Sequence, residues 1–331
     1  MSYLYVCEQG AKVCYEGGRF KVKSDDEILK EALAETLESI QIYGNVQITT
    51  QCMRECLERG IDVVMYSYTG KYHGRITSPY HIQVARQRVQ AAMTDDFKMA
   101  IARKLIHAKI KNQIVLLRRY IKNSDDTYEN ELALMQTLAN SALGATSNDE
   151  LMGYEGAAAK YYFEVLGKLV NPTFAFDKRT KRPPLDPFNA MLGMGYSRIH
   201  GELHGKIEAK GLNAYFGILH QDKEHHATLA SDLMEEWRPV IIDSTVMSML
   251  NGHELSIDDF QYEDEGAVYM QTEGRKKFMA KLESKFATEQ QYLAYIDYPV
   301  SFRNALDLQI NSLCHAIEEG RPEAYIPVHI R

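Results

Sequence analysis

The hydrophobic pattern changes its period near residue 80, and this change limits the folds that the chain can adopt. Before it, apolar runs such as LYVC, AKVCY and RFKVK alternate with Gly-containing turns, a pattern typical of β-strands. One short helix is predicted among them, at roughly Gln51 to Arg59 behind the caps Thr49 and Thr50. After GKYHGRITSPY, apolar residues recur mainly at helical spacing.

These patterns predict an α+β protein with a small N-terminal β domain, residues 1–80, followed by a larger all-α domain, residues 81–331. A length of 331 residues with 45% hydrophobic and 25% charged residues suits a globular protein of two domains. The N-terminus has no basic and apolar leader, and no run of about 18 apolar residues occurs. We therefore expect a cytoplasmic protein that does not enter a membrane.

Basic residues gather in one segment although the formal net charge is −7. Residues 81–124 hold ten Lys and Arg against two acids, Asp95 and Asp96. Lys104, Lys111 and Arg118 recur every seven residues and therefore share one face of a predicted helix. Such a face binds DNA phosphates or is simply a solvated helix surface. The charge pattern alone favours the solvated surface.

A carboxylate, Glu155, lies among small and apolar residues in the segment GYEGAAAKYYF. Ser147 and Glu150 form a capping-box pattern, which places Glu155 about two turns into a helix. Burying a carboxylate is costly unless it is paired or binds a cation. From this segment alone, a partly exposed Glu or one paired with an Arg is the simpler interpretation.

Two further segments supply groups that bind metals. His220 ends the apolar phrase YFGILH, and Asp232 and Glu235 are spaced i, i+3 on the next predicted helix. One imidazole with two or three carboxylates suits Mg²⁺ or Mn²⁺ better than zinc. Such a site polarises a phosphodiester and activates a hydroxyl or water for in-line attack. Spacing does not show that the segments meet, and His220 alone is more typical of a structural histidine.

Four ordered blocks of the chain resemble the signature blocks of the CRISPR-associated integrase of spacer acquisition, the "Cas one" family. The blocks are GYEGAAAKYYF, PPLDPFNAMLGMGYSRI, GLNAYFGILH and SDLMEEWRPVIID. The helix ARKLIHAKIKNQIVLLRR resembles the basic helix of the family, and the N-terminal strands resemble its β domain. The resemblance covers nearly the whole chain. One departure is EILKEALAETLESI, which is more acidic and helix-like than the short strand expected there.

The resemblance implies a metal-dependent DNA endonuclease or integrase. The metal-binding Glu, His and acidic residue of the family fall on Glu155, His220 and Glu235. Asp232 matches an additional acidic position near the metal. Which of Asp232 and Glu235 contributes more to metal binding stays open. The resemblance further implies that, with Mg²⁺ or Mn²⁺ bound, the 3′-hydroxyl of a captured DNA fragment would attack a phosphodiester of the CRISPR repeat, a transesterification without a covalent enzyme intermediate.

The resemblance also assigns residues around this centre. Asn189 and Tyr196 match family blocks and are expected to organise the site or to contact DNA. Basic residues expected to contact the DNA backbone are Lys104, Lys111, Arg118, Arg182, Arg275 and Lys276. Such contacts give affinity without sequence readout, and each of these charges is also consistent with a solvated surface.

The partners implied by the resemblance are DNA, as prespacer and CRISPR repeat, a second copy through the β domain, and the small "Cas two" protein that bridges two dimers. A trimming nuclease of the "Cas four" type is a further candidate. Two other functions remain open. The first is a branched-DNA repair nuclease with the same ligands, and the second is a catalytically silent DNA-binding scaffold in which Glu155 is only salt-bridged.

Overall fold

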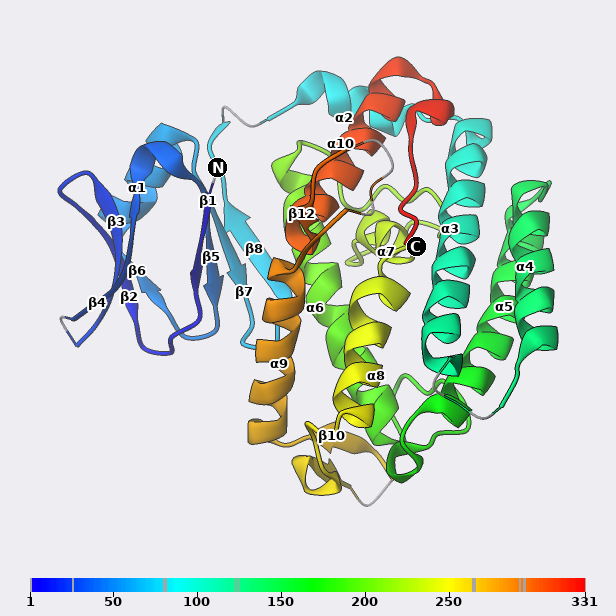
Figure 1. Cartoon of the computed structure of the whole chain (residues 1–331). Helices are drawn as coiled ribbons and strands as arrows, with labels where there is room; N and C mark the ends of the chain where they lie inside the picture. The colour runs from blue at the N-terminus through cyan, green and yellow to red at the C-terminus, as the bar shows by residue number, and fades with distance from the viewer. Residues whose placement is uncertain are drawn as a thin grey trace. The chain divides into compact units, whose positions relative to one another are not determined.

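The computed structural model describes residues 2–25, 27–79, 82–122, 124, 126–263, 266–291, 293 and 296–330. The contacts divide the chain into two compact units (Figure 1). The first is Met1–Ala91 with Ser197–Ala214, and the second is Ala92–Tyr196 with Tyr215–Arg331. The domain boundary predicted between residues 80 and 81 lies outside the described residues, so it stays a prediction.

The first unit is built on two four-stranded sheets. One sheet has the order β1-β5-β7-β8, with the strands Ser2–Val6, Leu37–Tyr43, Asp62–Tyr66 and Tyr72–Ile76. The other has the order β4-β3-β2-β6, with the strands Glu27–Leu33, Arg19–Ser24, Lys12–Glu16 and Gln47–Ile48. β1, β5 and β7 run parallel, whereas β8 is antiparallel to β7. The strand pattern of the N-terminal sequence is thereby confirmed.

Helix α1 (Thr50–Arg59) covers the buried core between these strands. The side chain of Thr49 accepts a hydrogen bond from the backbone N–H of Cys52, and Gly60 ends the helix with φ 69°. This confirms the predicted helix and its cap. Cys52 and Cys56 are fully buried free thiols within the core, which also contains Ile40 and Val63.

The segment EILKEALAETLESI, residues 27–40, looks more helix-like than the short strand expected there, yet it forms the edge strand β4, a single 3-10 turn at Ala34–Thr36 and the start of β5. β4 pairs antiparallel with β3, and most of its side chains are exposed. An exposed edge strand needs no alternation of apolar and polar residues, so its sequence lacks the strand signal. Pairing with β3 overrides the local helical preference.

Helix α6 (Pro187–Ala209) belongs to the second unit up to Tyr196 and to the first unit from Ser197 onward. In the first unit its backbone packs closely on the chain between β7 and β8, because a Cβ on Gly201 would collide with the carbonyl oxygen of Gly70. Arg198 is fully buried there, 2.7 Å from Glu202, with its guanidinium 4.9 Å from the ring centroid of Tyr43. These contacts explain why this half of α6 groups with the β unit. Helix α2 (Val84–Ala91) is also part of this unit.

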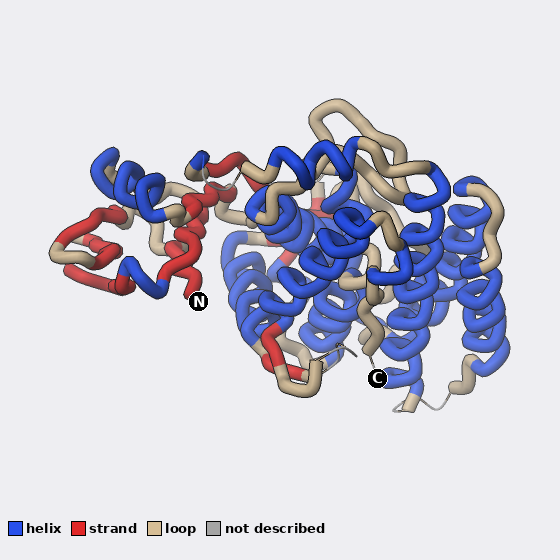
Figure 2. Tube along the Cα trace, turned by 90° about the horizontal axis from the view of Figure 1, so that it is seen from above, coloured by secondary structure: helices blue, strands red, loops and turns tan. Residues whose placement is uncertain are grey.

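The second unit is mostly helical, as Figure 2 shows for the described residues. Its helices are α3 (Asp95–Ile121), α4 (Glu129–Leu143), α5 (Asn148–Leu169), the first part of α6, α7 (Thr228–Met234), a π-helical segment (Arg238–Asp243), α8 (Ser244–Asn251), α9 (Thr272–Ala287) and α10 (Phe302–Glu319). Two short hairpins pair β9 (Phe260–Tyr262) with β10 (Val268–Met270), and β11 (Glu289–Gln290) with β12 (Val300–Ser301). The predicted fold class, a β region followed by a mostly helical region, is confirmed. Among the described residues, the length and hydropathy of each helix fall short of what a membrane span requires.

Helix α3 is the central helix of this unit and packs against α4 and α5. Thr94 caps it by accepting a hydrogen bond from the N–H of Phe97, at 3.2 Å. Its apolar residues Ile101 and Leu105 are fully buried, as the predicted stripe requires. The polar residues Lys109 and Asn112 are buried as well, so α3 is covered on more than its apolar face.

Polar side chains of α3 hold the C-terminal segment, residues 321–330, against the helical unit. Asn112 donates through Nδ2 to the carbonyl oxygens of Glu236 and Val328, at 3.0 and 2.9 Å, and accepts from the N–H of Ile330 at 3.0 Å. Lys104 donates to the carbonyl oxygens of Pro322, Glu323 and Tyr325. The C-terminal segment is therefore fixed by hydrogen bonds at both of its ends.

We expect Asn112→Ala to lower the free energy of unfolding by about 3 kcal/mol, because two carbonyls and one N–H lose a buried partner. Limited proteolysis should then cut the C-terminal segment faster than in the wild type. Asn140→Ala, at an exposed position on α4, is the matched control and should change stability by no more than about 0.5 kcal/mol. Equal proteolysis rates for wild type and Asn112→Ala would contradict the anchoring role.

Candidate active site

Glu155 lies on α5, whose N-terminus forms as the sequence predicts. The side chain of Ser147 accepts from the N–H of Glu150 at 3.2 Å. The return bond differs from a standard capping box, because Glu150 accepts from the N–H of Thr146, at 2.7 Å, instead of from that of Ser147. The side chain of Glu155 is 17% exposed. Its carboxylate therefore needs a partner inside the protein.

That partner is Lys109 of α3. The Nζ atom of Lys109 is hydrogen-bonded to Oε1 of Glu155 and lies 2.6 Å from Oε2 of Glu235. The side chains of Lys109 and Glu235 are only 6% and 3% exposed. One buried ammonium thus joins two carboxylates that come from different helical segments. The salt bridge considered for Glu155 exists, with a lysine in place of an arginine.

Glu235 is also paired with Arg238, whose Nη1 lies 2.9 Å from Oε1. Burial alone would raise the pKa of Glu235, but Arg238 and Lys109 outweigh burial and lower that pKa to about 2. Burial likewise opposes the charge on Lys109, and Glu235 and Glu155 together raise the pKa of Lys109. Glu235, Lys109 and Arg238 are therefore held in their charged forms.

Asp232 and His220 form a pair that is separate from the ion pairs of Glu155, Lys109, Glu235 and Arg238. Asp232 is fully buried, and its Oδ2 accepts from the N–H groups of Ile218 and Leu219 at 2.6 and 3.0 Å. Its Oδ1 lies 2.7 Å from Nδ1 of His220 and accepts from the His220 N–H at 3.2 Å. Asp232 thereby fixes both the backbone and the ring of His220. Nε2 is the ring nitrogen that Asp232 leaves for another ligand.

The two carboxylates expected to point to one side contact different partners. α7 ends at Met234, so Glu235 is its C-cap residue and turns to Lys109, whereas Asp232 turns to residues 218–220. Pro239 lies in the first turn of the π-helical segment that follows α7, where its missing N–H costs nothing.

The described residues contain no group of three or more His, Cys, Asp or Glu side chains placed to hold a metal ion. The oxygens of Glu155 and Glu235 nevertheless converge on a single cation, the ammonium of Lys109. Carboxylate oxygens arranged around one positive charge are the donor chemistry that Mg²⁺ and Mn²⁺ prefer. The charge of His220 adds a small contribution to the lowering of the pKa of Glu235. Glu155 and Glu235 therefore offer donor oxygens that suit a divalent ion, in the place that Lys109 now fills.

Tyr196 contacts both Asp243 and the arginine that pairs with Glu235. Its hydroxyl donates to Asp243 at 2.7 Å, and that of Tyr162 donates to the same carboxylate at 2.6 Å. The guanidinium of Arg238 lies 4.9 Å from the ring centroid of Tyr196, and that of Arg179 lies 5.4 Å from it. Burial raises the pKa of Asp243 to about 6. Tyr196 thus positions the arginine that pairs with Glu235.

Asn189 organises the loop that precedes α6. Its Nδ2 donates to the carbonyl oxygen of Lys178 and to Asp186, at 2.9 and 2.6 Å. Its Oδ1 accepts from Arg179 at 2.7 Å and from the Thr180 N–H at 3.2 Å. The side chain therefore fixes the loop that carries Arg179 toward Tyr196.

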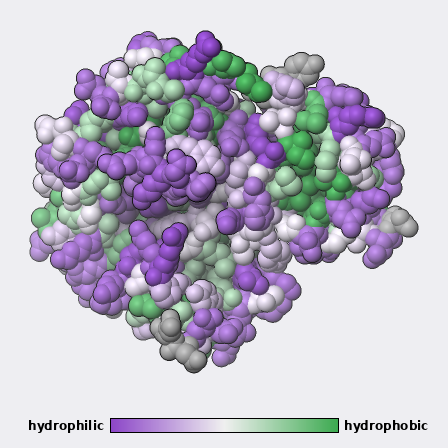
Figure 3. All heavy atoms as spheres, turned by 180° about the vertical axis from the view of Figure 1, so that it is seen from behind, coloured by the Kyte–Doolittle hydropathy of each residue, from purple (hydrophilic) through white to green (hydrophobic). Residues whose placement is uncertain are grey.

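The six basic residues predicted to contact DNA fall into two groups. Lys104 is engaged by the carbonyls of the C-terminal segment, and Lys111 donates to Gln136 at 2.7 Å. Arg275 is half-buried, near Thr272 at 3.4 Å. The exposed ones are Arg118, Arg182 and Lys276, the last of which pairs with Glu273. Hydrophilic residues cover much of the face seen in Figure 3. Contact with DNA stays a prediction for all six.

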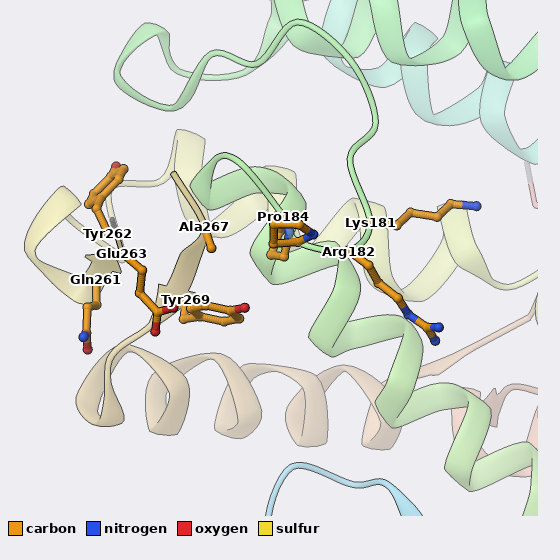
Figure 4. Close-up of a pocket in the computed structure, with 9 residues that line it drawn as sticks. Lys181, Arg182, Pro184, Gln261, Tyr262, Glu263, Ala267 and Tyr269 are labelled. Atoms are coloured by element: carbon orange, nitrogen blue, oxygen red, sulfur yellow. The ribbon is translucent and has the colours of Figure 1, made fainter. Parts of the chain in front are cut away.

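Arg182 lines a cavity of about 810 Å³ between the loop 181–184 and the β9–β10 hairpin (Figure 4). Tyr262 and Tyr269 of the hairpin line it too, at 53% and 45% exposure. Lys181 and Arg182 extend away from these rings in Figure 4. Burial, with Arg238 and Arg179, lowers the pKa of Lys181, so this loop also lies near the charged centre. The sequence did not predict this cavity.

The chain combines a β unit with a helical unit in which buried acidic residues share one cation. Similarity to known proteins identifies its family. The family described as "CRISPR associated protein Cas1" matches residues 4–284. The CRISPR-associated endonuclease Cas1 of Mycobacterium tuberculosis (strain ATCC 25618 / H37Rv) is 36% identical over 338 residues, covering 100% of this chain and 98% of that protein. This chain belongs to the CRISPR-associated protein Cas1 family. Membership supports a DNA endonuclease or integrase role.

Two other relatives carry Cas1 within larger assemblies. A Cas4 exonuclease/Cas1 endonuclease fusion of Geobacter sulfurreducens is 31% identical over 333 residues, covering 97% of this chain and 59% of the fusion. Among solved structures, a partial Cas6-RT-Cas1–Cas2 complex matches with a TM-score of 0.78 and 26% identity, over 98% of this chain and 97% of that one. The predicted resemblance to the integrase family is thus confirmed.

The hydrogen bond that Asp232 accepts from the ring of His220 raises the pKa of His220, although burial opposes it. A raised pKa means that charged His220 stabilises the fold below its unfolded pKa of about 6.5. This contribution is lost as the pH rises through the folded value. We expect Asp232→Asn to lower the pKa of His220, measured by NMR, and to flatten the pH dependence of stability in this range. Asp222→Asn, in the same loop but bonded to Gly217, is the control. An unchanged pKa in Asp232→Asn would contradict this assignment.

Proposed function

We propose that this chain is a metal-dependent DNA integrase that inserts captured DNA fragments into a CRISPR repeat array. In this reaction a fragment's 3′-hydroxyl attacks a repeat phosphodiester, so one P–O bond forms as another breaks and no covalent enzyme intermediate is needed. Membership in the Cas1 family supports the class of reaction. The observation that carries the metal requirement is the convergence of Glu155 and Glu235 on one buried cation.

Glu155, His220 and Glu235 would hold Mg²⁺ or Mn²⁺ in this proposal. The ion supplies Lewis-acid polarisation of a phosphate oxygen when it is bound. Asp232 holds Nδ1 of His220 and so presents Nε2, which makes Asp232 a positioning residue and Glu235 the acidic ligand. Arg238 keeps Glu235 ionised at neutral pH, because a charged guanidinium stands beside a buried carboxylate.

DNA contacts in this proposal come from exposed cations of the helical unit. Arg118 and Arg182 are exposed, and such side chains bind backbone phosphates without reading sequence. Tyr262 and Tyr269 add exposed aromatic rings to the cavity that Arg182 also lines.

The proposed protein partners follow from the relatives. Cas2 accompanies Cas1 in the solved complex, and Cas4 is fused to Cas1 in the Geobacter sulfurreducens protein. We propose both as partners of this chain, with a homodimer formed through the β unit. The edge strand β4 exposes Ile28, Leu29 and Leu33, and apolar side chains on an unpaired edge are suited to contact a second copy.

A catalytically silent scaffold is the second candidate, because the pairing of Glu155 with Lys109 is the salt bridge that a scaffold would contain. In a scaffold, replacing either carboxylate would change stability and leave no metal-dependent reaction to lose. A repair nuclease with the same ligands would cleave branched DNA and would not join a fragment to a repeat.

The test is strand transfer of a labelled duplex with a 3′-hydroxyl into a repeat-bearing plasmid, in Mg²⁺ or Mn²⁺, with and without Cas2. We expect Glu155→Gln and His220→Ala to lose at least about a hundredfold in rate, because each removes a ligand of the ion. Glu164→Gln, at an exposed Glu of α5 paired with Lys168, is the matched control and should keep its rate.

The outcomes separate the candidates. Joining that needs both metal and His220 supports the integrase. Cleavage of branched DNA without joining supports the repair nuclease. DNA binding that is equal in EDTA, with neither joining nor cleavage by the wild type and Cas2, supports the scaffold.

A further inference from the structure

The centre between Glu155 and Glu235 holds a cation that belongs to the protein. Lys109 reaches from α3 to both carboxylates, and its side chain is 6% exposed. Two carboxylates that share one ammonium repel each other strongly when no cation lies between them. Lys109 therefore keeps the two acidic residues together in the absence of a metal ion.

The formal charges of Glu155, Glu235, Lys109 and Arg238 cancel one another. Glu155 and Glu235 carry two negative charges, and Lys109 and Arg238 carry two positive ones. A divalent ion added to this set would leave a net charge of +2 in a place with little water, which is costly. Binding of the ion therefore requires one of the two cationic side chains to leave or anionic phosphate to arrive with it.

Lys109 is better able to move than Arg238. Arg238 contacts both oxygens of Glu235, at 2.9 and 3.0 Å, and its guanidinium stacks on Tyr196. The Lys109 ammonium is held by its ion pairs with Glu155 and Glu235, and such a compact group on a four-carbon stem reorients by rotation about single bonds. Its contacts with carboxylates are the same contacts that a divalent ion would make.

We propose that Lys109 is an exchangeable internal counter-ion, which occupies the cation position in the metal-free protein and yields it when a divalent ion binds. This inference rests on the proposed metal-dependent function. Lys109 stabilises the metal-free fold and weakens the apparent affinity for the ion, because each bound ion must displace an ion pair. The protein thereby keeps its acidic centre assembled without a metal.

The test compares Lys109→Met with the wild type in two measurements that need no catalysis. The first is the melting temperature in EDTA and in Mn²⁺, and the second is the Kd for Mn²⁺ from electron paramagnetic resonance. We expect Lys109→Met to melt lower in EDTA, to gain more from Mn²⁺, and to bind Mn²⁺ on the order of tenfold more tightly. Lys111→Met is the matched control, because Lys111 lies on the same helix but contacts Gln136. Its Mn²⁺ affinity should equal that of the wild type.

The outcomes distinguish failure of the Lys109 exchange from failure of the proposed metal dependence. Equal or weaker Mn²⁺ binding by Lys109→Met would overturn the exchange, even if the wild type binds Mn²⁺ and joins DNA. Absence of Mn²⁺ binding in every variant would overturn the proposed metal dependence itself, and the exchange with it. Folding of Lys109→Met only in Mn²⁺ would support the exchange, since the ion then replaces the missing ammonium.

The wild type supplies a second measurement if Lys109→Met does not fold under either condition. A lysine ammonium held between two buried carboxylates exchanges its protons slowly enough to give a ¹⁵N-detected Nζ signal. We expect this Lys109 signal to be lost or shifted on addition of Mg²⁺ in excess. An unchanged signal in protein that is saturated with Mg²⁺ would overturn the exchange.

Discussion

The pairing of one buried ammonium with two buried carboxylates holds three segments of the helical unit together. Lys109 comes from α3, Glu155 from α5, and Glu235 from the end of α7. None of these three charges is tolerable in an apolar interior without the others. The pairing therefore couples the placement of three helical segments to the electrostatics of one site, so the same contacts serve stability and function.

Neighbouring buried acids in this unit are compensated in different ways, and each way suits a different role. Asp232 receives backbone N–H groups and a histidine, and so it fixes a loop. Asp243 receives two tyrosine hydroxyls. Glu236 accepts from Gln309 and the Val328 N–H, and burial raises its pKa to about 8, which favours the neutral acid. Among these five acids, Glu155 and Glu235 are the two that share a lysine ammonium, which is the arrangement that an incoming cation can replace.

Much of the fold could be predicted from periodicity, because the change from strand to helical spacing follows from which faces are buried. The sequence also predicts the helix that carries Glu155, the cap of that helix and the acidic residues of the site. Lys109 was not, because one lysine among ten basic residues carries no sign of burial. The edge strand β4 and the return of Ser197–Ala214 to the β unit depend on pairing with distant residues, which local pattern does not record.

The clamp of Asp232 on residues 218–220 has a consequence for the thermodynamics of ligand capture. Three N–H groups and the imidazole are held by one carboxylate before any ligand is present. The backbone and the ring of His220 therefore have little conformational entropy left to lose when a ligand binds at Nε2. The cost of ordering this side of the centre is met during folding, and it is absent from the binding equilibrium.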